Sequence, residues 1–124
     1  MIDWRKLCAG ARDVQIAGDA VVVTLARDRQ HRVEVESKTD AVELRAVVAR
    51  RQEVDKHENP ALAAWNRNRA GSLVGFRLDE RGRLVGESWV PDAGLTADEF
   101  LVYLRNIAAA CDLFEFQLTG KDRE

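Results

Sequence analysis

Three runs between residues 21 and 48 show the hydrophobic and polar spacing of β-strands. Residues 21–25 are apolar and rich in valine, whereas around residues 33–35 and from Val42 to Val48 apolar residues alternate with mostly charged ones. A period of two with one charged face predicts an antiparallel sheet that is buried on one side. The links 27–30 and 37–40 are short and polar, as hairpin loops are. We therefore predict that the three strands form a meander.

A second hairpin is predicted over residues 72–90. Val74, Phe76 and Leu78 alternate with glycine and charged residues. The partner strand, residues 83–90, follows the sequence Asp-Glu-Arg-Gly at positions 79–82. The glycine of this sequence can adopt a positive φ, which favours a turn here.

One long helix is predicted to begin after Thr96, run to Thr119 and end at Gly120. Thr96 and Glu99 match the Ser/Thr-x-x-Glu capping box. Apolar residues then recur at steps of four and three and form a continuous stripe: Phe100, Leu104, Ile107, Cys111, Phe114 and Leu118. Because the apolar residues near the end of this segment also alternate, a helix that ends at Asp112 and is followed by a strand remains an alternative.

Two shorter helices and a loop complete the predicted elements. Residues 2–12 carry apolar side chains at helical spacing. Residues 60–70 follow Asn59-Pro60, a favoured N-cap and first-turn pair, and precede Gly71 as a terminator. Residues 50–58 are charged and poor in apolar side chains, which indicates a loop or a frayed strand end. The predicted fold is α+β, an antiparallel sheet with flanking helices in the order α-β-β-β-α-β-β-α.

Composition is consistent with one globular domain. The chain has 124 residues, of which 46% are hydrophobic and 32% charged, enough to bury a core without added staples. Residues 1–124 are interpreted as a single domain. No apolar run approaches 18 residues, and the N-terminus does not have the apolar run of a signal peptide. We therefore expect a cytoplasmic protein without a membrane span.

Net charge makes nucleic acid an unfavoured partner. The formal charge is −2, and residues 91–119 contain five acidic side chains against one arginine. Nucleic-acid-binding domains are usually basic or carry a basic stripe. Five arginines between residues 60 and 90 would support this partner only if they formed one continuous basic face: Arg67, Arg69, Arg77, Arg81 and Arg83.

Candidate chemistry is sparse. Cys8 and Cys111 are far apart and belong to no metal-binding motif, so we expect two reduced thiols that act as small buried hydrophobes. His31 and His57 lie in charged surroundings and are predicted to be exposed. The sequence contains no nucleophile elbow and no phosphate-binding glycine loop. We therefore predict no catalytic residue, no metal site and no cofactor.

The tryptophans carry more information. Trp4, Trp65 and Trp89 each bring a large apolar area and one N–H donor. Core packing is the default interpretation for at least one or two of them. Trp65 lies in the short, alanine-rich helix 60–70, whose small side chains permit close approach of another backbone. Self-association through this helix, across a two-fold axis, is a second possibility.

Residues 64–69, Ala-Trp-Asn-Arg-Asn-Arg, and the hairpin 74–88 resemble the YbjN-type domain, also called the bacterial sensory-transduction-regulator family. In the family pattern a helix with Trp-Asn or Phe-Asn precedes a hairpin with an Asp-x-x-Gly turn, and an acidic helix closes the domain. The resemblance covers residues 21–119. The family itself resembles the class I type III secretion chaperones in fold. It implies a bacterial protein, frequent homodimers and protein binding rather than catalysis. The family has no fixed functional motif from which a binding residue could be carried over.

We therefore predict a non-catalytic protein-binding module, chaperone-like or regulatory, that acts as a homodimer. Trp65, Phe76 and Trp89 are the candidate partner contacts, with core packing of all three as the competing interpretation. Client binding would use strand addition at a sheet edge or an apolar groove. The alternative is a small-ligand-binding protein or an enzyme, for which a deep pocket with convergent polar groups would be needed.

Overall fold

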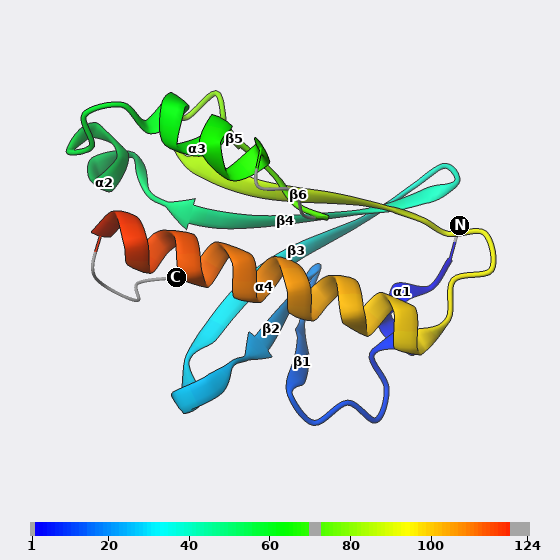
Figure 1. Cartoon of the computed structure of the whole chain (residues 1–124). Helices are drawn as coiled ribbons and strands as arrows, with labels where there is room; N and C mark the ends of the chain where they lie inside the picture. The colour runs from blue at the N-terminus through cyan, green and yellow to red at the C-terminus, as the bar shows by residue number, and fades with distance from the viewer. Residues whose placement is uncertain (1, 70–72, 120–124) are drawn as a thin grey trace.

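A single six-stranded antiparallel sheet organises the fold in the computed structural model, which describes residues 2–69 and 73–119 (Figure 1). The strands lie in the order β1-β2-β3-β4-β6-β5. Their bounds are β1 Val14–Ala17, β2 Ala20–Thr24, β3 Gln30–Lys38, β4 Ala41–Ala49, β5 Gly75–Leu78 and β6 Leu84–Pro91. The predicted α+β fold, with a β2-β3-β4 meander and a β5-β6 hairpin, is confirmed.

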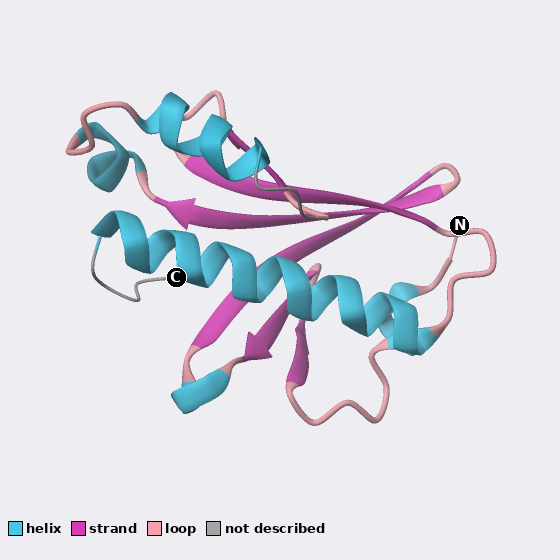
Figure 2. Ribbon diagram, in the orientation of Figure 1, coloured by secondary structure: helices cyan, strands magenta, loops and turns pink. Residues whose placement is uncertain are grey.

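The helices lie on one face and along one edge of this sheet (Figure 2). They are α1 Trp4–Leu7, α2 Arg51–Asp55, α3 Pro60–Arg69 and α4 Ala97–Thr119, with a short 3-10 turn, η1, at Ala26–Asp28. Helix α4 crosses β2, β3, β4 and β6, while α3 packs against β5. The core therefore lies between α4 and the sheet face that it covers.

Alternation along β4 shows how the sequence sets the two faces. Val42, Leu44 and Val48 are fully buried beneath α4, whereas Glu43 and Arg45 point to the other side and are half-buried. Since side chains alternate strictly in a strand, one face becomes core and the other remains open. The register between β4 and β6 shifts between Val47 and Ala49, which marks a bulge near one end of the pair.

Helix α4 follows the predicted pattern along its full length. Thr96 accepts a hydrogen bond from the Glu99 backbone at 3.2 Å, and the Glu99 carboxylate accepts one from the Thr96 backbone at 3.1 Å. The helix continues to Thr119, so the alternative of a strand after Asp112 is wrong. Gly120, the predicted terminator, lies outside the described residues.

Helix α3 begins as predicted. The Asn59 side chain accepts a hydrogen bond from the Leu62 backbone at 3.1 Å, which satisfies one donor of the first turn. The predicted terminator Gly71 and the expected start of the hairpin at Ser72 lie outside the described residues. In the β5-β6 turn, Gly82 adopts the predicted positive φ of 77°.

Three local features differ from prediction. The N-terminal helix covers only Trp4–Leu7, because the chain turns at Gly10, which has a φ of 83°. Strand β1 was not predicted, since its four residues at a sheet edge are too few to show a period of two. Residues 51–55 form the short helix α2, anchored by buried Val54, where a loop or frayed strand end was predicted.

Both cysteines are free and buried, as predicted. Trp4 is also a core residue, 4% exposed, which fits the default interpretation of the tryptophans. Among the described helices, none combines the length and apolarity that crossing a membrane requires.

Candidate functional site

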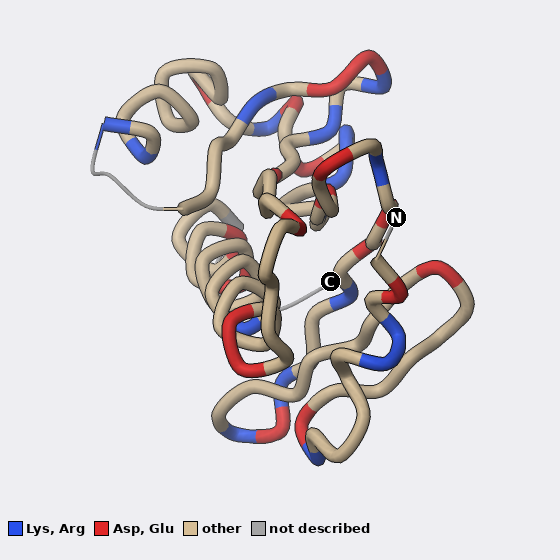
Figure 3. The backbone as a smooth tube through the Cα atoms, turned by 90° about the vertical axis from the view of Figure 1, so that its right-hand side faces the viewer, with Lys and Arg blue, Asp and Glu red and all other residues tan. Residues whose placement is uncertain are grey.

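The sheet face opposite α4 is the candidate interaction surface. Its outward-pointing residues on β3 are Arg32, Glu34 and Glu36, and all three are exposed. Acidic and basic residues are interspersed along the backbone rather than separated by sign (Figure 3). Such a mixed surface provides local pairs of charges rather than one strong field.

An ion-pair ladder crosses this face from the β5 edge towards β3. The Glu87 Oε1 atom accepts hydrogen bonds from the Arg77 Nε at 2.9 Å and lies 3.3 Å from the Arg45 Nη2. Arg45 Nη2 also contacts Glu43 Oε1 at 3.2 Å, and Lys38 Nζ lies 3.8 Å from Glu43 Oε2. The hydrogen bonds to Glu87 raise the pKa of Arg77 above its usual range. The ladder fixes the carboxylates of Glu43 and Glu87 in place.

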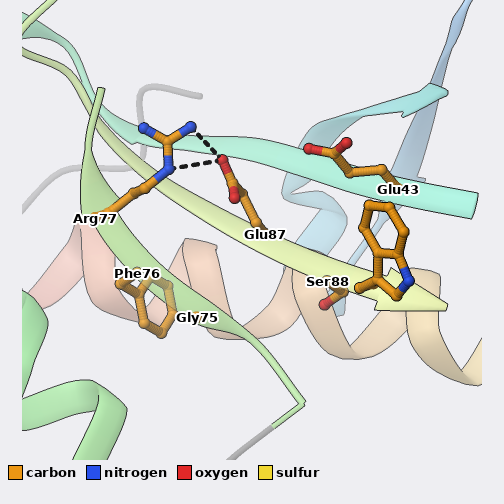
Figure 4. A pocket seen from close by; sticks show the side chains of 7 residues that line it. Glu43, Gly75, Phe76, Arg77, Glu87 and Ser88 are labelled. Carbon is orange, nitrogen blue, oxygen red and sulfur yellow. Dashed lines mark hydrogen bonds and ion pairs between the residues drawn. The ribbon is translucent and has the colours of Figure 1, made fainter. Parts of the chain in front are cut away.

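A hollow of about 320 Å³ opens between the side chains of this ladder (Figure 4). Gly75 on β5 lies directly opposite Glu87 on β6, and a β-carbon at position 75 would meet no atom within 4 Å. The missing side chain of Gly75 therefore leaves the space. Trp89, which pairs with Glu43 across β6 and β4, lines the hollow and is 60% exposed.

A second hollow, of about 290 Å³, lies between α3 and β5. Trp65 and Leu78 line it and are 54% and 37% exposed. The Asn68 amide positions α3 beside the strand: it accepts from the Phe76 N–H at 2.8 Å and donates to the Phe76 carbonyl at 3.0 Å. This side chain thereby occupies the backbone groups that Phe76 would offer to an added strand.

The structure brings the three predicted contact residues around β5 but exposes only two of them. Trp65 and Trp89 each line one hollow, and Phe76 contributes to the lining of both. The Phe76 side chain itself is only 6% exposed and packs edge-on against Phe114, with ring centroids 5.0 Å apart. Phe76 is thus a core residue rather than an exposed contact.

Four of the five arginines considered for nucleic-acid binding are engaged in varied local contacts. Arg77 pairs with Glu87, and Arg83 pairs with buried Asp79 at 2.8 Å. The guanidinium of Arg67 lies over the ring of Phe114, and that of Arg69 lies over Trp65. These contacts weigh against a continuous basic face.

The prediction that His31 is exposed is wrong. His31 is 1% exposed, because it alternates with Arg32 and points beneath α4, where its Nε2 lies 2.8 Å from the Val47 carbonyl oxygen. Charged neighbours in the sequence misled the prediction, since they occupy the other face of β3. His57 is half-buried, and its Nδ1 accepts a hydrogen bond from the Asn59 backbone at 3.2 Å.

Buried His31 lies beside two acids that the sequence analysis missed. Asp112 and Glu115, 3% and 1% exposed, are one helical turn apart on the covered face of α4. A ring nitrogen of His31 and one carboxylate oxygen from each acid all lie within 4.8 Å of one another. The available signal was two acids spaced i and i+3 within the apolar stripe of a long helix.

The fold and its open face define an α+β protein with one helix-covered sheet face and one face available for contacts. The chain belongs to the YbjN family, described as "Putative bacterial sensory transduction regulator", whose sequence model matches residues 9–119. The family resemblance in the sequence is thereby confirmed. No curated protein matches the chain.

Solved structures share the fold at low sequence identity. A chain in the crystal structure of the ExsC–ExsE complex is 17% identical, with a TM-score of 0.62 over 93% of this chain and 92% of that one. An uncharacterized protein from Methanothermobacter thermautotrophicus is 15% identical, with a TM-score of 0.60 over 97% and 96%. A chain of the HopA1–SchA chaperone–effector complex is more distant, with 11% identity and a TM-score of 0.49 over 76% and 73%.

Proposed function

We propose that this chain is a non-catalytic, single-domain protein-binding module that holds an extended segment of a client protein, in a chaperone-like or regulatory role. The observation that carries the proposal is the pair of exposed tryptophans, Trp65 and Trp89, lining two hollows that meet at β5. Tryptophans in hollows are typical anchors of protein interfaces. Membership of the YbjN family, and a fold shared with a chain of the ExsC–ExsE complex, support this role.

Contact through the hollows is favoured over strand addition at the β5 edge. Asn68 already pairs with both backbone groups of Phe76. A client strand would have to displace this side chain before it could extend the sheet. The hollow over Gly75 instead offers space for one client side chain, and it is lined by Trp89 and by the carboxylates of Glu43 and Glu87.

The module acts as a homodimer in the cytoplasm under this proposal. Helix α3 supports self-association, because it exposes Leu62 and Trp65 at 48% and 54%. Exposed apolar side chains grouped on one short helix are typical of interaction surfaces. Sedimentation equilibrium of the wild type and of Leu62→Ala tests the dimer separately from client binding.

The test of client binding is a tagged pull-down from native cytosol, quantified by mass spectrometry at two salt concentrations. The wild type is expected to retain one stoichiometric protein at both concentrations. Trp89→Ala, and Gly75→Val, which places a side chain into the hollow from a position where a β-carbon meets no atom, are expected to lose it. Val102→Ala is the matched control, since Val102 on α4 is 57% exposed and distant in sequence from β5.

Equal recovery of the partner by Gly75→Val and the wild type would place the contact elsewhere. Recovery of the tagged chain without any partner would favour the alternative, a small-ligand-binding protein or an enzyme. That alternative is supported less well, because both hollows are open to solvent rather than enclosed.

A further inference from the structure

A second, buried group of polar side chains lies on the opposite side of the sheet from the hollow at Trp89. His31 at the start of β3 faces Asp112 and Glu115 near the end of α4, and all three side chains are at least nine-tenths buried. Two carboxylates brought out of water next to each other are unfavourable unless cations or donors compensate them. The Arg29 guanidinium supplies one such cation, with its Nε 2.9 Å from Asp112 Oδ2.

Among the residues that the structure describes, two atoms of this group find no hydrogen-bond partner. They are the Nδ1 atom of His31 and the Oδ1 atom of Asp112, both fully inaccessible to solvent. Their companion atoms are both engaged: His31 Nε2 lies 2.8 Å from the Val47 carbonyl, and Asp112 Oδ2 accepts from the Arg29 Nε at 2.9 Å. Because a carbonyl only accepts hydrogen bonds, Nε2 carries the hydrogen and Nδ1 presents a lone pair.

This arrangement is characteristic of a metal ligand held by its surroundings. A metal-binding histidine usually donates its second ring N–H to a carbonyl or carboxylate, and a metal-binding carboxylate is itself hydrogen-bonded. His31 has the first of these features and Asp112 has the second. Ligands on a tetrahedral zinc ion lie roughly 3.4 Å apart, given bonds of about 2.0–2.2 Å. Small rotations of side chains that lie within 4.8 Å of one another would bring them to that spacing.

We propose that His31, Asp112 and Glu115 bind a divalent transition-metal ion of the Zn²⁺ type between β3 and α4. One imidazole nitrogen and two carboxylates suit Zn²⁺, Co²⁺ and Mn²⁺, and three protein ligands leave one position for water. The Arg29 guanidinium binds the Oδ2 atom of Asp112 and leaves its Oδ1 atom for the ion. The ion would join the end of α4 to the sheet and stabilise the folded chain.

The test uses the full chain, stripped of metal with a chelator and titrated with Zn²⁺ by calorimetry. We expect one ion per chain and a thermal midpoint that rises with Zn²⁺ concentration. Asp112→Asn and Glu115→Gln retain side-chain shape and are expected to weaken binding on the order of 100-fold. His57→Ala, which removes the other histidine of the chain, is expected to bind as the wild type does.

Cobalt and Arg29 provide two further readouts. Co²⁺ bound to the wild type is expected to give visible absorption bands that His31→Gln loses. Arg29→Gln removes the donor that holds Asp112 Oδ2 in place and is expected to weaken Zn²⁺ binding roughly 10-fold, as loss of a residue that orients a metal ligand usually does. Absence of a midpoint rise in the wild type would overturn the proposal, as would Zn²⁺ binding that is lost in His57→Ala but retained in Asp112→Asn.

Discussion

Gly86 of β6 and Cys111 of α4 approach so closely that a β-carbon at position 86 would lie 2.5 Å from the Cys111 Sγ. The same β-carbon would lie 3.1 Å from the ring of Phe76 and 3.1 Å from the side chain of Val74. Gly86 is therefore a point of close contact between β6 and the long helix α4. A glycine within a strand often marks such a close approach.

We predict that Gly86→Ala destabilises the chain by about 1–3 kcal/mol, the usual range for overpacking a well-filled core. The added methyl group cannot move aside, because it is attached to the backbone of a strand paired on both sides. Urea denaturation followed by circular dichroism measures the change in the free energy of unfolding.

Gly75→Ala is the matched control, because its β-carbon would enter open space. It should leave stability within about 0.5 kcal/mol of the wild type, as surface substitutions usually do. Cys111→Ala removes the sulfur that the new methyl group meets, so it should partly rescue Gly86→Ala in a double-mutant cycle. Simple additivity of the two substitutions would contradict the contact.

The buried thiols give a chemical prediction. Burial raises the pKa of both Cys8 and Cys111, which suppresses the reactive thiolate form. In Ellman's assay the native chain should react negligibly over minutes, and the chain unfolded in guanidinium should react at both cysteines. Rapid reaction of the native protein at Cys111 would show that the α4–sheet contact opens readily.

Features set by regular periodicity could be predicted from the sequence. The alternation along β4 and the stripe and capping box of α4 depend on residues near one another in the chain, so both were recovered. Strand β1 could not be recovered, because pairing with β2 stabilises this four-residue segment. Helix α2 is similar, since buried Val54 anchors an otherwise polar segment.

The candidate sites depend on the register between paired strands, which cannot be read from the sequence alone. Trp65 and Trp89 were identified by their residue type, but the hollow beside Trp89 arises from Gly75 lying opposite Glu87. His31 was misplaced because the face that it occupies depends on the pairing of β3 with its neighbours. Its proximity to Asp112 joins positions far apart in the sequence and required the packed fold.

Asn68→Ala tests how α3 is attached to the sheet. Loss of the amide leaves the N–H and carbonyl of Phe76 without their protein partner, so we expect a destabilisation of about 1–2 kcal/mol. The Phe76 amide proton should also exchange faster with solvent, as measured by NMR. Asn66→Ala, an exposed position on the same helix, should change neither quantity.

Asp79 provides a pH-dependent prediction. Burial raises the pKa of its carboxyl group. This effect is outweighed by hydrogen bonds from the Arg83 backbone N–H, the Arg83 guanidinium and the Arg81 backbone N–H, which lower the pKa below its ordinary value of 3.8. A lowered pKa in the folded chain contributes stability above pH 3.8 that is lost as the pH falls through the folded-state pKa.

Asp79→Asn should therefore destabilise the chain at pH 7 by about 1–3 kcal/mol, because hydrogen bonds to a charged group are lost. Its free energy of unfolding should also fall less steeply than that of the wild type below about pH 4. Thermal denaturation from pH 7 to pH 2 measures both effects. Glu80→Gln in the same turn is the control, and an equal acid sensitivity in Asp79→Asn and the wild type would contradict the assignment.

The position of α4 in chain order has a consequence for biosynthesis. All six strands precede this helix, yet it covers β2, β3, β4 and β6. A ribosome therefore releases the whole apolar sheet face before the residues that shield it have been translated. During that interval the nascent chain presents an unshielded sheet to the cell, so co-translational holding by a ribosome-associated factor would protect this protein most while residues 97–119 are being made.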